Sequence, residues 1–103
     1  MFDVTALKER YFDIKIEDEH DELVVLHLYG PSKDDMTKLK TLMSNPDDVD
    51  TDALYELVHH FLNKNKDHIV IPESLTYGMS FDIVVSILYA YFDWVSEVRA
   101  EKN

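Results

Sequence analysis

Apolar and polar residues alternate over two segments near the start of the chain. The apolar positions are Phe12, Ile14 and Ile16 in the first segment and Val24, Leu26 and Leu28 in the second. A period of two is typical of strands that bury one face. The acidic residues 17–22 lie between the two segments and predict an exposed loop. The pattern therefore predicts a β-hairpin over about residues 11–29.

A helix is expected directly after the hairpin. The Gly-Pro pair at 30–31 ends the second strand, and Ser32 precedes Asp35 by three residues, which is the spacing of a capping box. The apolar positions that follow are Met36, Leu39, Leu42 and Met43. The Asn-Pro pair at 45–46 ends this segment, because a residue before proline avoids the helical conformation. The pattern predicts a helix over about 32–45.

Two more helices are predicted, over about 51–63 and 81–100. The apolar positions of the first are Leu54, Leu57, Val58, Phe61 and Leu62, at helical spacing. The apolar residues of the last helix fill more than one narrow stripe, so both a core face and a second contact face are expected.

The apolar residues 69–71, which precede a proline, predict a short extended segment between these two helices. Because the sequence shows no repeat and no linker, we expect residues 1–103 to form a single α+β domain of one N-terminal hairpin and three main helices.

Composition narrows the classes of function. The 103 residues carry 10 Lys and Arg against 21 Asp and Glu, a formal net charge of −11, which would repel a nucleic-acid backbone. The absence of cysteine excludes disulfides, a thiolate nucleophile and cysteine zinc sites. No run of apolar residues is long enough for a membrane helix, and the start lacks the features of a signal peptide. We expect a cytoplasmic protein with neither nucleic acid nor membrane as a partner.

Two groups of residues raise the question of metal binding. A calcium loop starting at Asp48 would need glycine and glutamate where Ala53 and His59 stand, so the acidic residues are expected to cap the second helix instead. Those acidic residues are Asp47, Asp48, Asp50 and Asp52. The other group consists of Glu56, His60 and His68, with His59 beside them, and completes no known zinc pattern. Surface histidines and an i,i+4 hydrogen bond between Glu56 and His60 are expected there.

Catalytic motifs are missing from the sequence. With only Gly30 and Gly78 the chain can form neither a phosphate-binding loop nor a dinucleotide fingerprint. No serine stands in a nucleophile-elbow motif, and no pair of carboxylates is set in apolar surroundings. We expect a protein that is not an enzyme and has no cofactor.

Aromatic residues are concentrated in the last predicted helix. They are Tyr89, Tyr91, Phe92 and Trp94. Leu88, Tyr91 and Val95 share the spacing of a core stripe. The candidates for anchoring a partner or a second subunit are Trp94, Tyr89 and Tyr77.

The two ends of the chain resemble a known family. The segments are Phe2-Asp3-Val4-Thr5-Ala6-Leu7 leading into Arg10-Tyr11-Phe12-Asp13-Ile14-Lys15-Ile16, and Tyr91-Phe92-Asp93-Trp94-Val95-Ser96-Glu97-Val98. They resemble tail assembly chaperones of long-tailed, siphovirus-like bacteriophages or prophages of Gram-positive bacteria. The likeness in architecture, a short β element followed by helices, extends over most of the chain.

The resemblance implies a protein that binds the tape measure protein and keeps it soluble until tail tube subunits polymerise around it. Such a protein acts in the host bacterial cytoplasm and is absent from the mature virion. A longer form made by ribosomal frameshifting is common in the family, and Glu101-Lys102-Asn103 can be encoded as GAA AAA AAC, which contains the slippery heptamer A AAA AAC. The partner-binding residues expected on the last helix are Tyr89, Phe92, Trp94 and Val98.

Two alternatives from other classes stay open. The net charge of −11 suits an acidic interaction protein or an inhibitor that imitates nucleic acid. The residues Glu56, His60 and His68 would serve a small enzyme or metal module. A second apolar face on the last helix would also allow a homo-oligomer.

Overall fold

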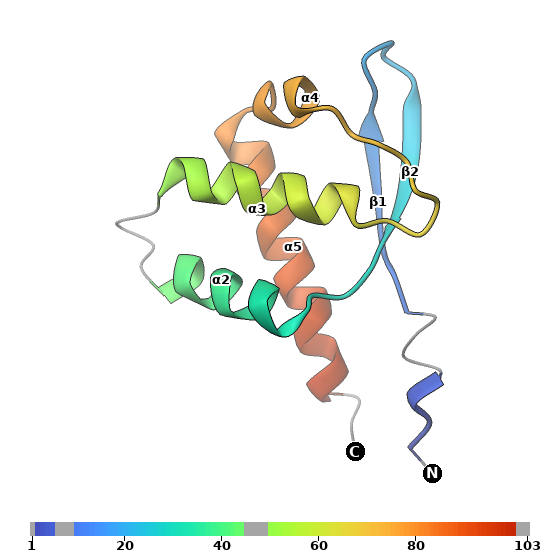
Figure 1. Ribbon diagram of the computed structural model, residues 1–103, viewed down its shortest axis with the longest axis vertical. Helices are drawn as coiled ribbons and strands as arrows, with labels where there is room; N and C mark the ends of the chain where they lie inside the picture. Colours follow the sequence, from blue (N-terminus) through green and yellow to red (C-terminus); the bar gives the residue numbers. More distant parts are fainter. Residues whose placement is uncertain (1, 6–9, 45–49, 101–103) are drawn as a thin grey trace.

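The computed structural model describes residues 2–5, 10–44 and 50–100 of the chain, and of residues 98–100 it describes the backbone alone. It places one β-hairpin beside a group of helices (Figure 1). The elements in chain order are β1 (Phe12–Glu17), β2 (Leu23–Leu28), α2 (Lys33–Ser44), α3 (Thr51–Asn63), α4 (Glu73–Tyr77) and α5 (Phe81–Ala100). The predicted α+β fold, mainly helical with an N-terminal hairpin and a long last helix, is confirmed.

The hairpin has the register that the alternation of its residues requires. β1 and β2 are antiparallel, with Phe12 opposite Leu28 and Glu17 opposite Leu23. Leu26 and Leu28 are fully buried, whereas His27 between them is partly exposed. In the turn, the carboxylate of Asp18 accepts hydrogen bonds from the backbone of His20 and Glu22. These bonds to Glu22 and His20 stabilise the ionised form and lower the pKa of Asp18.

The start of α2 confirms the predicted capping box. The backbone N–H of Asp35 donates to the hydroxyl of Ser32, and the backbone N–H of Ser32 donates to the carboxylate of Asp35. α2 reaches Ser44, and the predicted end at residue 45 lies outside the described residues.

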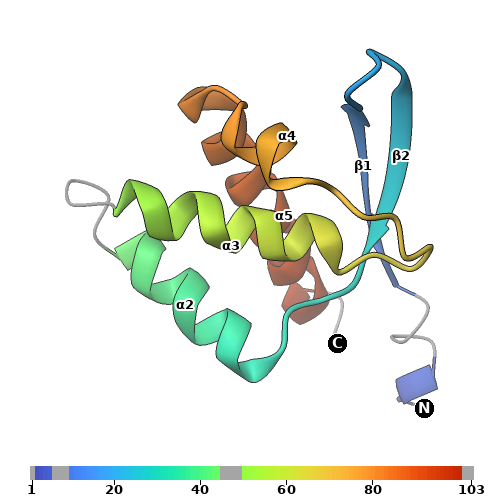
Figure 2. The same ribbon diagram turned by 45° about the horizontal axis from the view of Figure 1, so that its top comes forward.

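α3 is the central helix of the fold. It packs against α2, α4, α5 and β2, and it crosses in front of α5 in two views of the molecule (Figures 1 and 2). The carboxylate of Asp50 caps its first turn by accepting from the backbone of Ala53 over 3.2 Å. This confirms the capping role for Asp50, while Asp47 and Asp48 lie outside the described residues. The residues that α3 buries are Leu54, Leu57, Val58, Phe61 and Leu62.

A short helix between α3 and α5 was not predicted. α4 has five residues, too few to show a helical period, and it begins directly after Pro72. The predicted extended piece at 69–71 is irregular, with its backbone held by side chains. Asn65 binds the backbone N–H and C=O of Ile69, and Asn63 does the same for Ile71, at 2.8 to 3.1 Å.

Candidate functional site

α5 distributes its apolar residues over three sides. Val84, Leu88 and Tyr91 are buried in the core, at 0 to 3% exposure. A second set lies toward β1 and consists of Ile83, Ile87 and Ala90. A third set lies toward α2 and consists of Phe81, Val85 and Tyr89, which line a hollow of about 120 Å³ with Leu42 and Met43. Apolar residues of α5 therefore lie on both sides of the core stripe, and each side is a candidate for the second contact face expected from the sequence.

The side of α5 toward the hairpin borders a wide cavity. It is a groove of about 860 Å³, with β1 as one wall and α4 and α5 as the other. Its apolar lining consists of Phe12, Ile14, Ile16, Leu75, Met79, Ile83, Ile87 and Ala90. Ile83 keeps 51% of its surface exposed. Because a contiguous apolar groove on the surface of a small protein is typical of a binding site, this is the candidate binding site.

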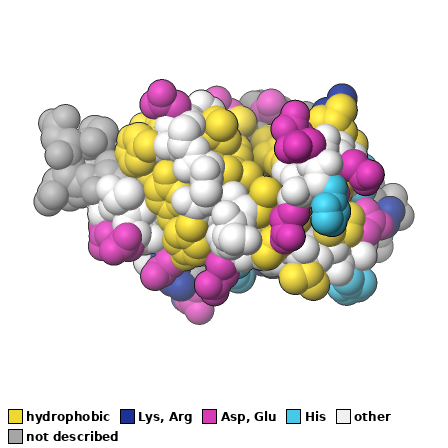
Figure 3. Space-filling view, turned by 90° about the horizontal axis from the view of Figure 1, so that it is seen from above, with side chains coloured by type: hydrophobic (Ala, Val, Ile, Leu, Met, Phe, Trp, Pro, Cys, Tyr) yellow, Lys and Arg dark blue, Asp and Glu magenta, His cyan; other side chains and the backbone are white. Residues whose placement is uncertain are grey.

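The surroundings of the groove are acidic. A view onto α4 and the hairpin tip shows apolar side chains in a broad area with Asp and Glu side chains around it (Figure 3). Glu17 and Lys15 are the charged residues that line the groove itself. Asp82 is exposed next to Ile83 at the start of α5. On the face shown, the carboxylates do not form the two rows that a mimic of duplex nucleic acid would need.

Contacts with α3 hold the α4 wall of the groove in place. The Tyr55 hydroxyl donates to the backbone carbonyl of Met79 over 2.9 Å. His59 shares a hydrogen bond of 2.8 Å with the hydroxyl of Thr76, which is fully buried. Gly78 follows α4, and a Cβ at this position would lie 2.8 Å from the carbonyl oxygen of Ser74. The wall is therefore fixed by side chains of α3 and by a close backbone approach that only glycine permits.

An aromatic cluster closes the end of the groove near Phe12. The ring centroid of Trp94 lies 5.7 Å from that of Phe12 and 5.5 Å from that of Tyr91. The guanidinium of Arg10 lies over the Trp94 ring at 4.2 Å and donates to the Trp94 carbonyl over 2.7 Å. The two ends of the chain that carry the family resemblance thus meet in this cluster.

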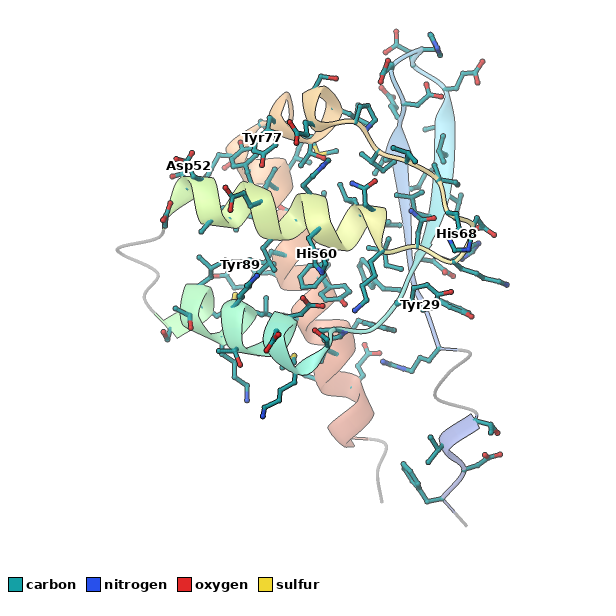
Figure 4. The ribbon with its side chains drawn as sticks, viewed as in Figure 1. Tyr29, Asp52, His60, His68, Tyr77 and Tyr89 are labelled. Carbon is teal, nitrogen blue, oxygen red and sulfur yellow. The ribbon has the colours of Figure 1, made fainter. Side chains whose placement is uncertain are left out.

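The three predicted partner-binding residues whose side chains are described do not form one surface. Tyr89 is 46% exposed and lies on the α2 side of α5 (Figure 4). Phe92 is half-buried against the core, and Trp94 is half-buried on the hairpin side. Val98 lies in α5, but its side chain is outside the described residues. Ile83, which the sequence reasoning did not single out, is more exposed than Phe92 and Trp94 and lies along the groove.

A charged cluster joins α2 to α3. Asp35 has a side chain only 8% exposed, and its carboxylate contacts Nε2 of His60 at 3.0 Å and Nζ of Lys64 at 3.1 Å. Burial acts to raise the pKa of Asp35, but the hydrogen bonds from Ser32 and Lys64 and the charges of His60 and Lys64 outweigh it and lower this pKa. His60 thus pairs with Asp35 on α2, and no hydrogen bond joins it to Glu56 among the described residues.

The histidines expected in a metal module are far apart. His60 lies on α3, whereas His68 lies in the segment that crosses the hairpin (Figure 4). His68 has a positive φ of 57°. Within residues 2–5, 10–44 and 50–100, no three His, Asp or Glu side chains are placed to hold a metal ion.

Comparison of the chain with known protein families, curated proteins and solved structures finds no match. Of the helices that the structure describes, none is both long and apolar enough to cross a membrane.

Proposed function

We propose that the chain is a tail assembly chaperone of a long-tailed bacteriophage or prophage of Gram-positive bacteria. It binds an apolar segment of the tape measure protein in the groove between β1 and α5 and keeps that protein soluble during tail morphogenesis. The observation that supports this proposal is the apolar groove of about 860 Å³ with Ile83 half-exposed beside it. A protein that holds an aggregation-prone partner needs such an open apolar surface, because burial of apolar area drives the association.

The net charge of −11 is consistent with the same role. A complex that carries this charge repels its own copies and stays dispersed, while basic segments of a partner are attracted. In this proposal the protein acts in the host cytoplasm, releases the tape measure protein to the tail tube protein, and is absent from the mature virion. A frameshift-extended product and a homo-oligomer belong to the same proposal.

The test is co-expression with the long reading frame that encodes the tape measure protein. We expect this product to become soluble and to co-purify with the chain. Ile83→Glu places a carboxylate in the groove and should lower the soluble fraction by about tenfold. Val70→Glu is the matched control, because Val70 is 81% exposed and does not line the groove.

Tyr89→Glu provides the second comparison, since Tyr89 lies on the α2 side of α5. If Tyr89→Glu abolishes solubilisation and Ile83→Glu does not, the partner binds the α2 side and the groove assignment is wrong. If the tape measure product stays insoluble with the unchanged chain, the chaperone proposal is wrong. The acidic inhibitor then becomes the leading hypothesis, and nucleic-acid-binding proteins are the partners to screen.

A further inference from the structure

The hydrogen bonds of the hairpin define which backbone groups of β1 point away from β2. The backbone N–H of Asp18 donates to the carbonyl oxygen of Glu22 over 2.8 Å, so these two residues form a hydrogen-bonded pair. In an antiparallel ladder, hydrogen-bonded pairs alternate with pairs whose backbone groups point outward. Counting back from Asp18 along the register, Ile16 is hydrogen-bonded to β2. The residues whose N–H and C=O groups point away from β2 are Asp13, Lys15 and Glu17.

The opposite edge of the hairpin gives the same alternation. The backbone N–H of Lys66 donates to the carbonyl of His27 over 2.9 Å, and the N–H of Tyr29 donates to the carbonyl of Lys64 over 3.0 Å. The backbone N–H and C=O groups of His27 therefore point away from β1, just as those of its register partner Asp13 point away from β2. These two bonds join the outer edge of β2 to the segment after α3 at its His27 end.

The outer edge of β1 is open by comparison. In the part of the chain that the structure describes, β1 pairs with β2 alone, and no further backbone bond reaches Asp13, Lys15 or Glu17. An unpaired strand edge is a template for another strand. Proteins protect such edges unless they use them.

This open edge lies along the groove. Lys15 and Glu17 line the groove even though their side chains are exposed on the outer face of the hairpin, so the groove runs beside the backbone of β1. The facing wall presents Ile83, Ile87 and Ala90 of α5. A strand laid against β1 would gain main-chain hydrogen bonds on one side and apolar contacts on the other.

We infer that the groove takes its occupant as an added β-strand on the outer edge of β1. The inference rests on the proposed function and specifies the kind of segment that is bound. Alternate residues of that segment are apolar and face Ile83, Ile87 and Ala90. The residues between them carry charges opposite to those of Asp13, Lys15 and Glu17, in the order basic, acidic, basic. This order reads the same in both directions, so it suits a parallel or an antiparallel strand.

A helix would satisfy the site less well. The backbone groups of a helix are hydrogen-bonded within the helix. A bound helix would therefore exclude water from the groove and leave the outward N–H and C=O groups of β1 without partners. An extended segment supplies both partners. The placement of the charges also distinguishes a bound strand from a bound helix. Charged residues at every second position lie on one side of a strand, but they point in different directions around a helix.

The test uses the whole chain and the acetylated, amidated peptide Val-Lys-Val-Glu-Val-Lys-Val. Hydrogen exchange followed by NMR should show that this peptide slows exchange of the backbone amides of Asp13, Lys15 and Glu17. The amides of Ile14 and Ile16, already bonded within the hairpin, should not change by more than about twofold. Protection of neither set, or of α5 amides alone, would overturn the inference.

Backbone N-methylation separates the strand from a helix. Methylating the backbone nitrogens of the three charged residues, or those of the two central valines, removes N–H groups from opposite edges of a strand. One of the two sets should weaken binding at least tenfold, and the other should leave it within about twofold. If both methylated sets weaken binding, as is expected for a bound helix, strand addition is contradicted. It is also contradicted if neither set weakens binding. A peptide with Glu-Lys-Glu in place of Lys-Glu-Lys should bind several-fold more weakly.

The proposed function and this inference can fail separately. If the tape measure product is solubilised in an Ile83-dependent way while the amides of Asp13, Lys15 and Glu17 stay unprotected in that complex, the function stands and strand addition is wrong. If the peptide binds as described but the tape measure product stays insoluble, the strand site stands and its natural occupant is another protein.

Discussion

Tyr91 donates a hydrogen bond from its phenol to the backbone carbonyl of Tyr29 over 2.8 Å and so joins α5 to the end of β2. The Tyr91 side chain is 1% exposed, and its ring stacks on Phe61 with the centroids 4.3 Å apart. Burial, aided by the negative charge of Asp35, raises the pKa of Tyr91, so the phenol stays protonated as a donor. This bond spans 62 residues of sequence and fixes the hairpin relative to the last helix.

Tyr91→Phe should lower the free energy of unfolding by about 1–2 kcal/mol, because it leaves the Tyr29 carbonyl without its partner while the ring packing stays. Urea denaturation measures the change. Tyr89→Phe is the control, because Tyr89 is exposed and its hydroxyl bonds to no described residue. This control should stay within about 0.5 kcal/mol. An equal loss in both variants would show that the hydroxyl of Tyr91 contributes nothing specific.

Asp35 should make the stability depend on acid. Its pKa is lowered below the ordinary value of 3.8, so its contribution is present above that pH and is lost as the pH falls through the lower folded value. In this pH range the unfolded chain binds the proton more readily than the folded protein, so the free energy of unfolding decreases as the pH falls. Asp35→Asn should cost about 2–3 kcal/mol at pH 7 and should lose less stability than the unchanged protein on acidification below about pH 4.

Thermal unfolding at several pH values measures this effect. Asp34→Asn is the matched control, because Asp34 lies in the same helical turn but is exposed and forms no ion pair with a described residue. A parallel loss of stability in the unchanged protein and in Asp35→Asn across the acid range would exclude Asp35 as the group responsible.

Trp94→Ala should destabilise the fold by about 2–4 kcal/mol, because it removes a half-buried ring from its contacts with Phe12, Tyr91 and Arg10. Any loss of partner binding in this variant follows from the displaced hairpin. Trp94→Phe keeps an apolar ring and should recover more than half of the stability, as measured by urea denaturation. A fully stable Trp94→Ala variant that has lost only binding would return Trp94 to the direct contact surface.

Asn65→Ala should cost about 2–4 kcal/mol. The Asn65 side chain is 2% exposed and bonds to the carbonyls of Leu62 and Ile69 and to the N–H of Ile69. Lys66→Ala, at an exposed neighbouring position, should change the free energy of unfolding by less than about 0.5 kcal/mol. Stability within that margin for Asn65→Ala would mean that water replaces the lost bonds.

The sequence was most informative where a local rule decides the structure. The alternation in 12–16 and 24–28, the cap formed by Ser32 and Asp35, and the apolar period of α3 each depend on residues a few positions apart. α4 escaped because five residues do not complete two turns. The ion pair of Asp35 and His60 was not predicted, because it joins two helices and no local sequence pattern specifies how these helices are placed relative to each other.

The candidate site was predicted only in part. The excess of apolar residues in α5 correctly indicated that some of them lie outside the core stripe. Which residues lie on it depends on the elements beside α5, and the packing of Phe12 and Arg10 removes Trp94 from free solvent while Ile83 stays open. The apolar residues of β1 and of α5 were each recognisable in the sequence. That they face each other across a groove could not be predicted, because the two elements are far apart in the sequence.

The course of α5 has a consequence for a longer translation product. The groove ends along this helix at Ala90, and the ten residues from there to Ala100 rise by about 15 Å toward the end of the molecule away from α4. Extra residues joined after α5 would start beyond that distance. Within the proposed function, a frameshift-extended product would carry its added residues at that end and leave the groove accessible. Both products would then bind the same partner segment, and the ratio in which the ribosome makes them would set how many appended segments each tape measure molecule carries.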